Sequence, residues 1–264
     1  MAFWQDAKPI LLDVCQSEKM RQLLPLSKIQ LLHAVTETET ETEYGRPNRS
    51  FVIREGRFTP AQRKAFEQHW PDYGIATDEL QPLDLQQYFT AQQPLVLDIG
   101  FGAGDSLLSL AKQRPDLNFV GVEVYRPGIG AVMQRLHQQE INNVRLINAD
   151  VVPLLEQCIA SVSITGVLVW FPDPWPKKRH HKRRLIRPNF LDQVQRILRP
   201  EGVLHLASDW QPYVVDMQEQ LAIYPELKPL ISAPHPLAIS RPDTRFQQRG
   251  LRLGHKLSDL IYLR

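Results

Sequence analysis

From residue 94 onward, short apolar segments alternate along the chain with longer amphipathic ones, and this alternation limits the fold more than any other feature. Alternation of this kind is typical of β–α–β units, in which helices connect the strands of a parallel sheet. Continuous apolar runs of strand length indicate strands that are buried on both faces. We expect strands at 95–99, 119–124, 144–148, 164–171 and 203–207, and helices at 105–113, 126–140 and 182–198.

The chain has 264 residues and a nearly balanced charge, with 31 Lys and Arg against 29 Asp and Glu. This length accommodates one good hydrophobic core and an appendage. No apolar run approaches the roughly 18 residues of a membrane span, and the N-terminus lacks the layout of a signal peptide. The two cysteines, Cys15 and Cys158, are too few for a disulfide framework and lack metal-site spacing. We therefore expect a cytoplasmic protein without a metal ion.

Two segments precede the alternating region. Residues 1–44 form an N-terminal extension that ends in an alternating Thr-Glu tract. Because this tract has nothing to bury, it indicates a flexible acidic linker. Residues 45–93 form a basic arm with a helical pattern at 60–70, and we expect this arm to contact RNA or to pack on the core.

One carboxylate stands in a proline-stiffened loop at 171–176, which reads Phe-Pro-Asp-Pro-Trp-Pro. The prolines restrict the backbone on either side of Asp173 and Trp175. The loop follows a buried strand, so Asp173 lies at a strand's carboxyl end, where open α/β sheets place their ligands. We predict that Asp173 is the catalytic acid. Trp175 has two interpretations, stacking on a nucleic-acid base or packing in the core.

Cations follow this loop without interleaved carboxylates. A local concentration of positive charge is the electrostatic footprint of nucleic-acid binding, even where the net charge is only +2. The residues expected to contact RNA are Arg179, His180, His181, Lys182, Arg183 and Arg184. A second basic stripe is expected if the segment at 241–256 is helical. Its members would be Arg241, Arg245, Arg249, Arg252 and Lys256.

The strand at 95–99 leads into a glycine-rich loop with Gly100, Gly102 and Gly104. Glycines at such a turn allow a cofactor to approach the backbone closely. The dinucleotide fingerprint requires Gly-x-Gly-x-x-Gly, but Asp105 stands where the third glycine would fall. A nicotinamide-dependent oxidoreductase is therefore disfavoured.

Acidic residues lie at the ends of three successive strands, namely Asp98, Glu123 and Asp150. A carboxylate at position 98 would repel a pyrophosphate, but it suits a positively charged cofactor such as S-adenosylmethionine. Asp98 would lie near the amino-acid moiety, Glu123 at the ribose hydroxyls and Asp150 at the adenine amine. For Asp150, an ordinary loop carboxylate is an equally good interpretation.

Several motifs together resemble the bacterial tRNA (guanine-N7)-methyltransferases. They lie at 98–104, 121–124, 171–175 with the basic run after it, 208–210 and 249–255. The resemblance covers residues 49–264. It implies an α/β class I methyltransferase (Rossmann-like) fold, with a mostly parallel seven-stranded sheet, helices on both faces and an antiparallel last strand at 257–263.

The resemblance also implies an activity. Residues 94–264 would form a domain that transfers a methyl group from S-adenosylmethionine to guanine N7 in the tRNA variable loop, which gives 7-methylguanosine. The partner would be tRNA, with no membrane, and we expect a monomer. The implied cofactor-binding residues are Asp98, Gly100, Gly102, Gly104, Glu123, Asp150 and Asp173, with Asp173 also at the catalytic position. The implied substrate-binding residues are Lys177, Asp209, Thr244, Arg245, Phe246 and Gln247.

Two positions depart from the family pattern. Asp98 stands where glutamate is common, and Gln247 replaces an acid. The expected chemistry needs no general base, because guanine N7 has an in-plane lone pair and no hydrogen. Asp173 would orient the base and stabilise positive charge. Two other functions stay open, an exocyclic-amine nucleic-acid methyltransferase and a non-catalytic RNA-binding module.

Overall fold

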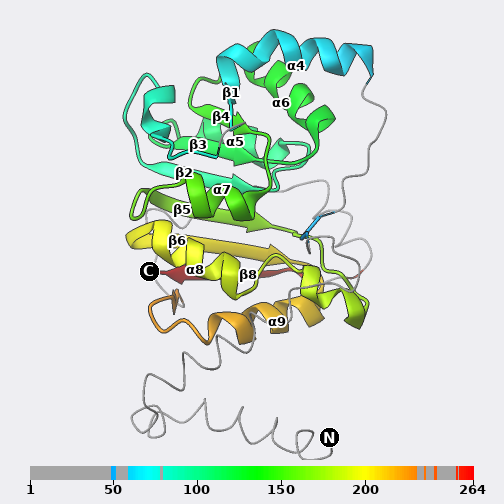
Figure 1. Cartoon of the computed structure of the whole chain (residues 1–264), viewed down its shortest axis with the longest axis vertical. Coiled ribbons are helices and arrows are strands. Elements are labelled where there is room, and N and C mark those ends of the chain that lie inside the picture. The colour runs from blue at the N-terminus through cyan, green and yellow to red at the C-terminus, as the bar shows by residue number, and fades with distance from the viewer. Residues whose placement is uncertain are drawn as a thin grey trace, which may run out of the picture. The chain divides into compact units, whose positions relative to one another are not determined.

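The computed structural model describes residues 49–51, 59–77, 80–230, 235, 241–242, 254 and 256–264 (Figure 1). The chain divides into two compact units, Met1–Arg49 and Ser50–Arg264. The second unit contains all of the helices and strands discussed below. The predicted acidic linker within 1–44 and the predicted substrate segment 244–247 lie outside the described residues.

A mixed sheet forms the centre of the second unit. Within the described residues it has eight strands in the order β1-β4-β3-β2-β5-β6-β8-β7. Neighbouring strands from β1 to β6 are parallel, whereas β8 is antiparallel to β6 and to β7. The strands are β1 (Gly74–Ile75), β2 (Leu95–Ile99), β3 (Asn118–Val122), β4 (Val144–Ile147), β5 (Ile164–Trp170), β6 (Leu198–Ser208), β7 (Lys228–Pro229) and β8 (Ser258–Leu263).

Helices cover both faces of this sheet (Figure 1). One face carries α4 (Pro60–Tyr73), α5 (Asp105–Gln113) and α6 (Arg126–Gln138), and the other carries α7 (Val151–Cys158), α8 (Pro188–Ile197) and α9 (Gln211–Leu221). Each helical layer packs on its own hydrophobic cluster. Successive residues of β2 alternate between the clusters, since Leu97 lies on the α7–α9 side and Val96 on the α5–α6 side.

The predicted mostly parallel sheet with an antiparallel last strand is confirmed, with one additional strand. This strand, β1, pairs with the outer edge of β4, and its two residues are too few to give a periodic pattern. Helix α7 is also absent from the sequence-based expectation. It is almost entirely apolar and contains Pro153, so its pattern has no clear polar face.

The helix predicted at 182–198 starts later than expected. Residues Lys178–Arg183 form a short 3₁₀ helix, η3, and α8 begins only at Pro188. Proline is favoured in the first turn of a helix, because the amide hydrogen that it lacks would have no partner there. Another short 3₁₀ segment, η2 (Leu85–Tyr88), precedes β2. Across the described part of the chain, the structure contains no helix with the length and apolar character needed to cross a membrane.

Candidate active site

Carboxylates gather at one edge of the parallel strands. Asp98 is the penultimate residue of β2, Glu123 directly follows β3, and Asp150 directly precedes α7. Asp173 follows β5 and Asp209 follows β6. Because the carboxyl ends of parallel strands lie at the same edge of a sheet, the fold brings these acids to one side of the unit.

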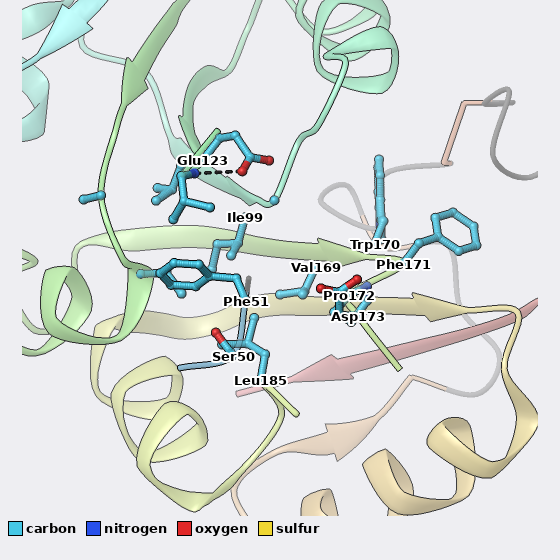
Figure 2. A pocket seen from close by; sticks show the side chains of 15 residues that line it. Ser50, Phe51, Ile99, Glu123, Val169, Trp170, Phe171, Pro172, Asp173 and Leu185 are labelled. Atoms are coloured by element: carbon cyan, nitrogen blue, oxygen red, sulfur yellow. Dashed lines mark hydrogen bonds between the residues drawn. The ribbon is translucent and has the colours of Figure 1, made fainter. Parts of the chain in front are cut away.

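A pocket with about 210 Å³ of water-accessible space opens at this edge (Figure 2). Gly100, Glu123 and Asp173 all line it. The glycine-rich loop, the end of β3 and the proline-rich loop therefore share one cavity. Asp98, Asp150, Lys177 and Asp209 are not part of its wall.

Ser50 and Phe51 also line the pocket, although the sequence analysis did not assign them to the site. They belong to the arm that precedes α4, far from the pocket's other residues in sequence. Apolar side chains at the strand ends, such as Ile99 and Val169, form much of the remaining wall (Figure 2). The pocket wall thus combines apolar side chains with two carboxylates, Glu123 and Asp173, and such a combination is usual for sites that bind small molecules.

The glycine-rich loop has a backbone that only glycine adopts easily. Gly100, Gly102 and Gly104 have φ angles of 75°, 55° and 74°. A Cβ atom on Gly104 would lie 2.5 Å from Cγ2 of Val132, so this residue packs closely against α6. A Cβ atom on Gly100 or Gly102 would meet nothing within 4 Å. The loop is therefore tight on the side of the helix and open at the first two glycines.

Asp98 is almost fully buried, and its Oδ2 atom has no hydrogen-bond partner among the described residues. Burial, and in second place the charge of Glu123, raises the pKa of Asp98 to about 7. A buried carboxylate oxygen without a partner is costly, and a cationic donor would remove that cost. The position therefore fits a ligand that brings positive charge to the end of β2.

Glu123 is held by three backbone amides. Its Oε2 atom accepts a hydrogen bond from Gly102 N at 3.1 Å. Its Oε1 atom accepts from Val124 N at 2.7 Å (Figure 2) and from Tyr125 N at 3.1 Å. These bonds fix the carboxylate at the pocket wall. Carboxylate oxygens accept about two hydrogen bonds each, so Oε2 retains capacity for a ligand hydroxyl.

Asp150 has a structural role as the N-cap residue of α7. Its Oδ1 atom accepts a hydrogen bond from Val152 N at 3.2 Å and thereby caps the N-terminus of α7. The neighbours of Asp150 on both sides, Ala149 and Val151, line the pocket. The predicted contact between Asp150 and an adenine amine stays a prediction.

The proline-rich loop contains two residues in a strained backbone conformation. Phe171 and Trp175, on either side of Asp173, have φ angles of 57° and 44°, which non-glycine residues rarely adopt. Two hydrogen bonds hold them, from Phe171 N to the Ala207 oxygen at 2.8 Å and from Trp175 Nε1 to the Ser50 oxygen at 3.1 Å. The surroundings therefore fix the loop in addition to its prolines.

Trp175 packs against residues of η3. The guanidinium of Arg183 lies 5.1 Å from the centroid of the indole, and His180 contacts it edge-on at 5.7 Å. With the bond to Ser50, these contacts favour packing over base stacking as the role of Trp175 in this structure.

Arg184 differs from its basic neighbours, because its side chain is only 2% exposed. Its Nε atom donates to the Pro174 oxygen at 3.0 Å, and its Nη1 atom lies 3.0 Å from Asp216 of α9. Its guanidinium also stacks on the Tyr213 ring at 4.8 Å. The predicted RNA contact of Arg184 does not agree with this burial. Arg184 instead ties the loop that carries Asp173 to α9.

The other basic residues near this loop all retain contact with solvent. Lys177, Lys178, Arg179 and Lys182 are exposed on and just before η3, and His180, His181 and Arg183 are half-buried. We call these seven residues the η3 basic surface. Partial burial, followed by the nearby charges of Arg179, Arg183 and Lys177, lowers the pKa of His180. The neighbouring cations thus disfavour the charged form of His180.

The predicted second basic stripe is only partly described. Arg241 does not belong to an RNA surface, because its side chain is only 7% exposed. Two nitrogens of Arg241 donate to Asp259 of β8 at 3.0 and 3.1 Å, and its guanidinium lies 5.0 Å from the Phe171 centroid. Lys256 is exposed, and the other three members lie outside the described residues.

These features together define a class of enzyme. A sheet with helices on both faces, an antiparallel strand beside the last parallel one, a glycine-rich loop after β2 and acids at the following strand ends are the features of class I, Rossmann-like methyltransferases. In agreement, residues 92–260 match the family described as "Putative methyltransferase".

More specific relatives share most of this chain. It is 44% identical over 228 residues to the tRNA (guanine-N(7)-)-methyltransferase of Nitrosococcus oceani, covering 86% of this chain and 95% of that relative. It is 44% identical over 223 residues to the enzyme of the same name from Pseudoalteromonas atlantica. This match covers 84% of this chain and 93% of that relative. The chain belongs to the tRNA (guanine-N(7)-)-methyltransferase family.

Proposed function

We propose that this protein transfers a methyl group from S-adenosylmethionine to N7 of a guanine in the tRNA variable loop and so forms 7-methylguanosine. The names of its relatives support guanine N7 of a tRNA as the methyl acceptor. The observation that supports the donor is the buried Oδ2 of Asp98, which lacks a partner among the described residues and could accept a hydrogen bond from a cationic group. A tRNA substrate also agrees with the cytoplasmic location expected from the sequence.

The residues at the sheet edge fit this cofactor. Asp98 would accept hydrogen bonds from its α-ammonium group, and Glu123 would accept from the ribose hydroxyls. The open backbone at Gly100 and Gly102 would let the cofactor approach closely. When bound, S-adenosylmethionine supplies an electrophilic methyl group on a positively charged sulfur.

Asp173 would act on the guanine without taking a proton from it. The N7 atom carries no hydrogen, so the reaction needs alignment and charge stabilisation. Alignment alone lowers the activation free energy by up to roughly 7–11 kcal/mol in favourable systems. The carboxylate of Asp173 would orient the purine through its N–H donors and stabilise the positive charge that the ring gains. Its fixed loop prepares this arrangement in advance.

The η3 basic surface would hold the tRNA beside the pocket. It begins four residues after Asp173, and tRNA backbones bind mainly through cation–phosphate contacts. Lys177, at the N-terminal end of η3, and Asp209, after β6, are the described members of the proposed substrate-binding set.

Transfer of labelled methyl groups to unmodified tRNA, followed by nucleoside identification, tests the proposal. We expect 7-methylguanosine as the product. A base methylated on an exocyclic amine would instead support the other type of nucleic-acid methyltransferase. Retained tRNA binding without methyl incorporation would support the non-catalytic RNA-binding module.

Binding of tRNA should weaken steeply with salt, because each neutralised phosphate releases counterions. A plot of the logarithm of the tRNA association constant against the logarithm of the salt concentration should have a negative slope. Exchanging Arg179 or Lys182 for glutamine should make this slope less steep by about 1 for each phosphate that is no longer neutralised. Filter binding between low and high salt measures this slope. Lys112→Gln is a matched control, since Lys112 is exposed in the last turn of α5, the end of that helix remote from the carboxyl edge of the sheet. Equal slopes in all variants would contradict the assignment.

Arg184→Lys should lower the turnover number at least about tenfold, because a misplaced catalytic group loses much of the benefit of alignment. Lysine keeps the charge but not the planar group that reaches Pro174 and stacks on Tyr213. The tRNA dissociation constant should change less than about twofold, since Arg184 is buried. Steady-state kinetics and filter binding separate the two effects, with the exposed Arg179→Lys as the control. Weaker tRNA binding with unchanged turnover would show a direct RNA contact instead.

A further inference from the structure

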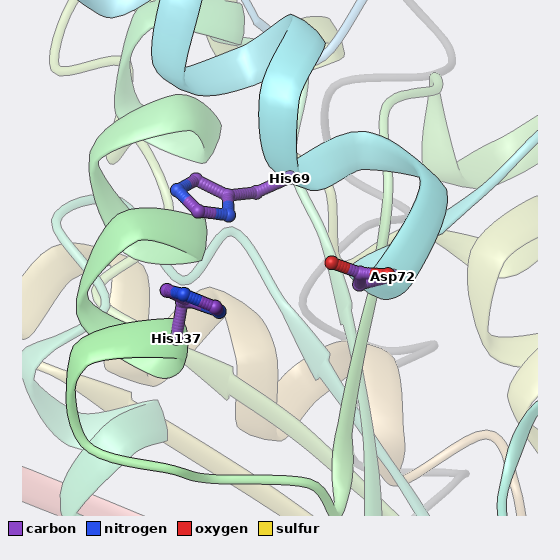
Figure 3. Close-up of side chains that lie close together, drawn as sticks. All are labelled: His69, Asp72 and His137. Atoms are coloured by element: carbon purple, nitrogen blue, oxygen red, sulfur yellow. The ribbon is translucent and has the colours of Figure 1, made fainter.

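Three side chains of metal-ligating types lie at the contact between α4 and α6, away from the pocket. His69 and Asp72 are on α4, and His137 is in the last turn of α6. One ligand atom from each residue lies within 4.8 Å of the other two. In Figure 3 the two imidazoles and the carboxylate face the same space between the helices.

Close packing of the helices holds these side chains in place. His69 and Asp72 are three positions apart, so they share one face of α4. Gly130 allows α6 to approach, because a Cβ atom there would lie 2.9 Å from the Gln62 oxygen. Phe66 and Trp70 stack at 4.7 Å in the same part of α4. The ligand atoms are thus supported by two rigid elements.

The environment of the two imidazoles suits a metal ion. The ring centroids of His69 and His137 are 4.6 Å apart, and His69 is only 7% exposed. Among the described residues, neither ring has a side-chain hydrogen-bond partner. Two imidazolium cations would repel each other at this separation, whereas neutral imidazoles are good metal ligands.

We propose that His69, Asp72 and His137 bind one Zn²⁺ ion, with water as the fourth ligand. Two imidazole nitrogens and one carboxylate oxygen are a normal zinc set, at about 2.0–2.2 Å from the metal. Asp72 and His137 are exposed, so small side-chain rotations close the ligand set around the ion. The metal clamps α4 to α6 and so fixes the N-terminal arm on the sheet. Cysteine spacing gave no sign of a metal site, and His69 and His137 are 68 positions apart in sequence and meet only in the fold.

Zinc binding by the full-length protein tests the proposal. After removal of metals with a chelator, titration with Zn²⁺ in competition with a chromophoric zinc indicator should give one equivalent of tight binding. Asp72→Asn and His137→Gln should each weaken it by more than about tenfold, since even outer-shell partners contribute that much. Both positions are exposed, so circular dichroism should show an unchanged fold. His180→Gln, which removes a histidine of the η3 basic surface, should still bind one equivalent.

Thermal unfolding gives a readout that does not depend on the indicator. A free zinc concentration about 100-fold above Kd should raise the unfolding temperature by about 5–10 °C for a chain of this size. This increase should disappear in Asp72→Asn and His137→Gln, and Mg²⁺ should not produce it. The proposal is overturned if the wild type binds no zinc, if both variants keep the site, or if only His180→Gln loses it.

Discussion

Replacing Asp173 with asparagine should reduce the turnover number about 10²–10³-fold, the usual loss for one preorganised electrostatic contact in a transition state. The tRNA dissociation constant should change less than about twofold, because phosphate contacts dominate affinity. Asparagine keeps the size of the side chain and one acceptor oxygen, but it lacks the negative charge that we propose stabilises a cationic purine. Single-turnover methyl transfer and filter binding measure the two quantities separately.

Asp116→Asn is a suitable control for this experiment. Asp116 is an exposed carboxylate that pairs with Arg114 at 2.7 Å, outside the wall of the pocket. This variant should methylate tRNA at the normal rate. Normal turnover in Asp173→Asn as well would refute the role given to Asp173, and a large loss of tRNA affinity would indicate a binding role instead.

Replacing Asp98 with asparagine should weaken the binding of S-adenosylmethionine by at least about 30-fold, because removal of one partner from a buried charge pair typically costs about 2–5 kcal/mol. In the wild type, the pKa of Asp98 is raised to about 7, so binding should strengthen about tenfold between pH 6 and pH 8 as the carboxyl ionises. The variant should lack this pH dependence. Calorimetric titration measures both effects.

Adenosine is the matched ligand for this prediction, because it has the ribose and adenine but no ammonium group. Its affinity should be nearly independent of pH in both proteins. Equal pH dependence for adenosine and S-adenosylmethionine would show that a group other than Asp98 is responsible.

The same carboxyl should affect the stability of the ligand-free protein. Its pKa is raised from 3.8 to about 7 by burial, so the folded state holds the proton more tightly than the unfolded state. The resulting stabilisation is complete below pH 3.8 and is lost as the pH rises to about 7. Asp98→Asn should therefore unfold at a higher temperature than the wild type at pH 8. The difference in unfolding temperature between the two proteins should be smaller at pH 5.

The strands could be predicted well because buried parallel strands give continuous apolar runs. The observed β2 has the predicted bounds, and β5 ends one residue before the predicted limit. The location of the acids at one edge could also be predicted, because it follows from the strand ends and the parallel direction of the strands.

Contacts between residues that are distant in sequence could not be predicted in this way. Arg183 and Arg184 are identical and adjacent in sequence, yet only Arg184 meets Pro174 and Asp216 inside the protein. Ser50 reaches the pocket although Trp175, its hydrogen-bond partner, is 125 positions away. The cap formed by Asp150 depends on α7, which the apolar pattern did not reveal.

The bond between Trp175 and the Ser50 backbone has a consequence for substitutions near the pocket. Both Ser50 and Asp173 line the pocket, so one hydrogen bond joins the segment before α4 to the loop that carries Asp173. A displacement of Ser50 would break this bond and remove one support of that loop. Substitutions near Ser50 should therefore affect the far side of the pocket as well as their own side.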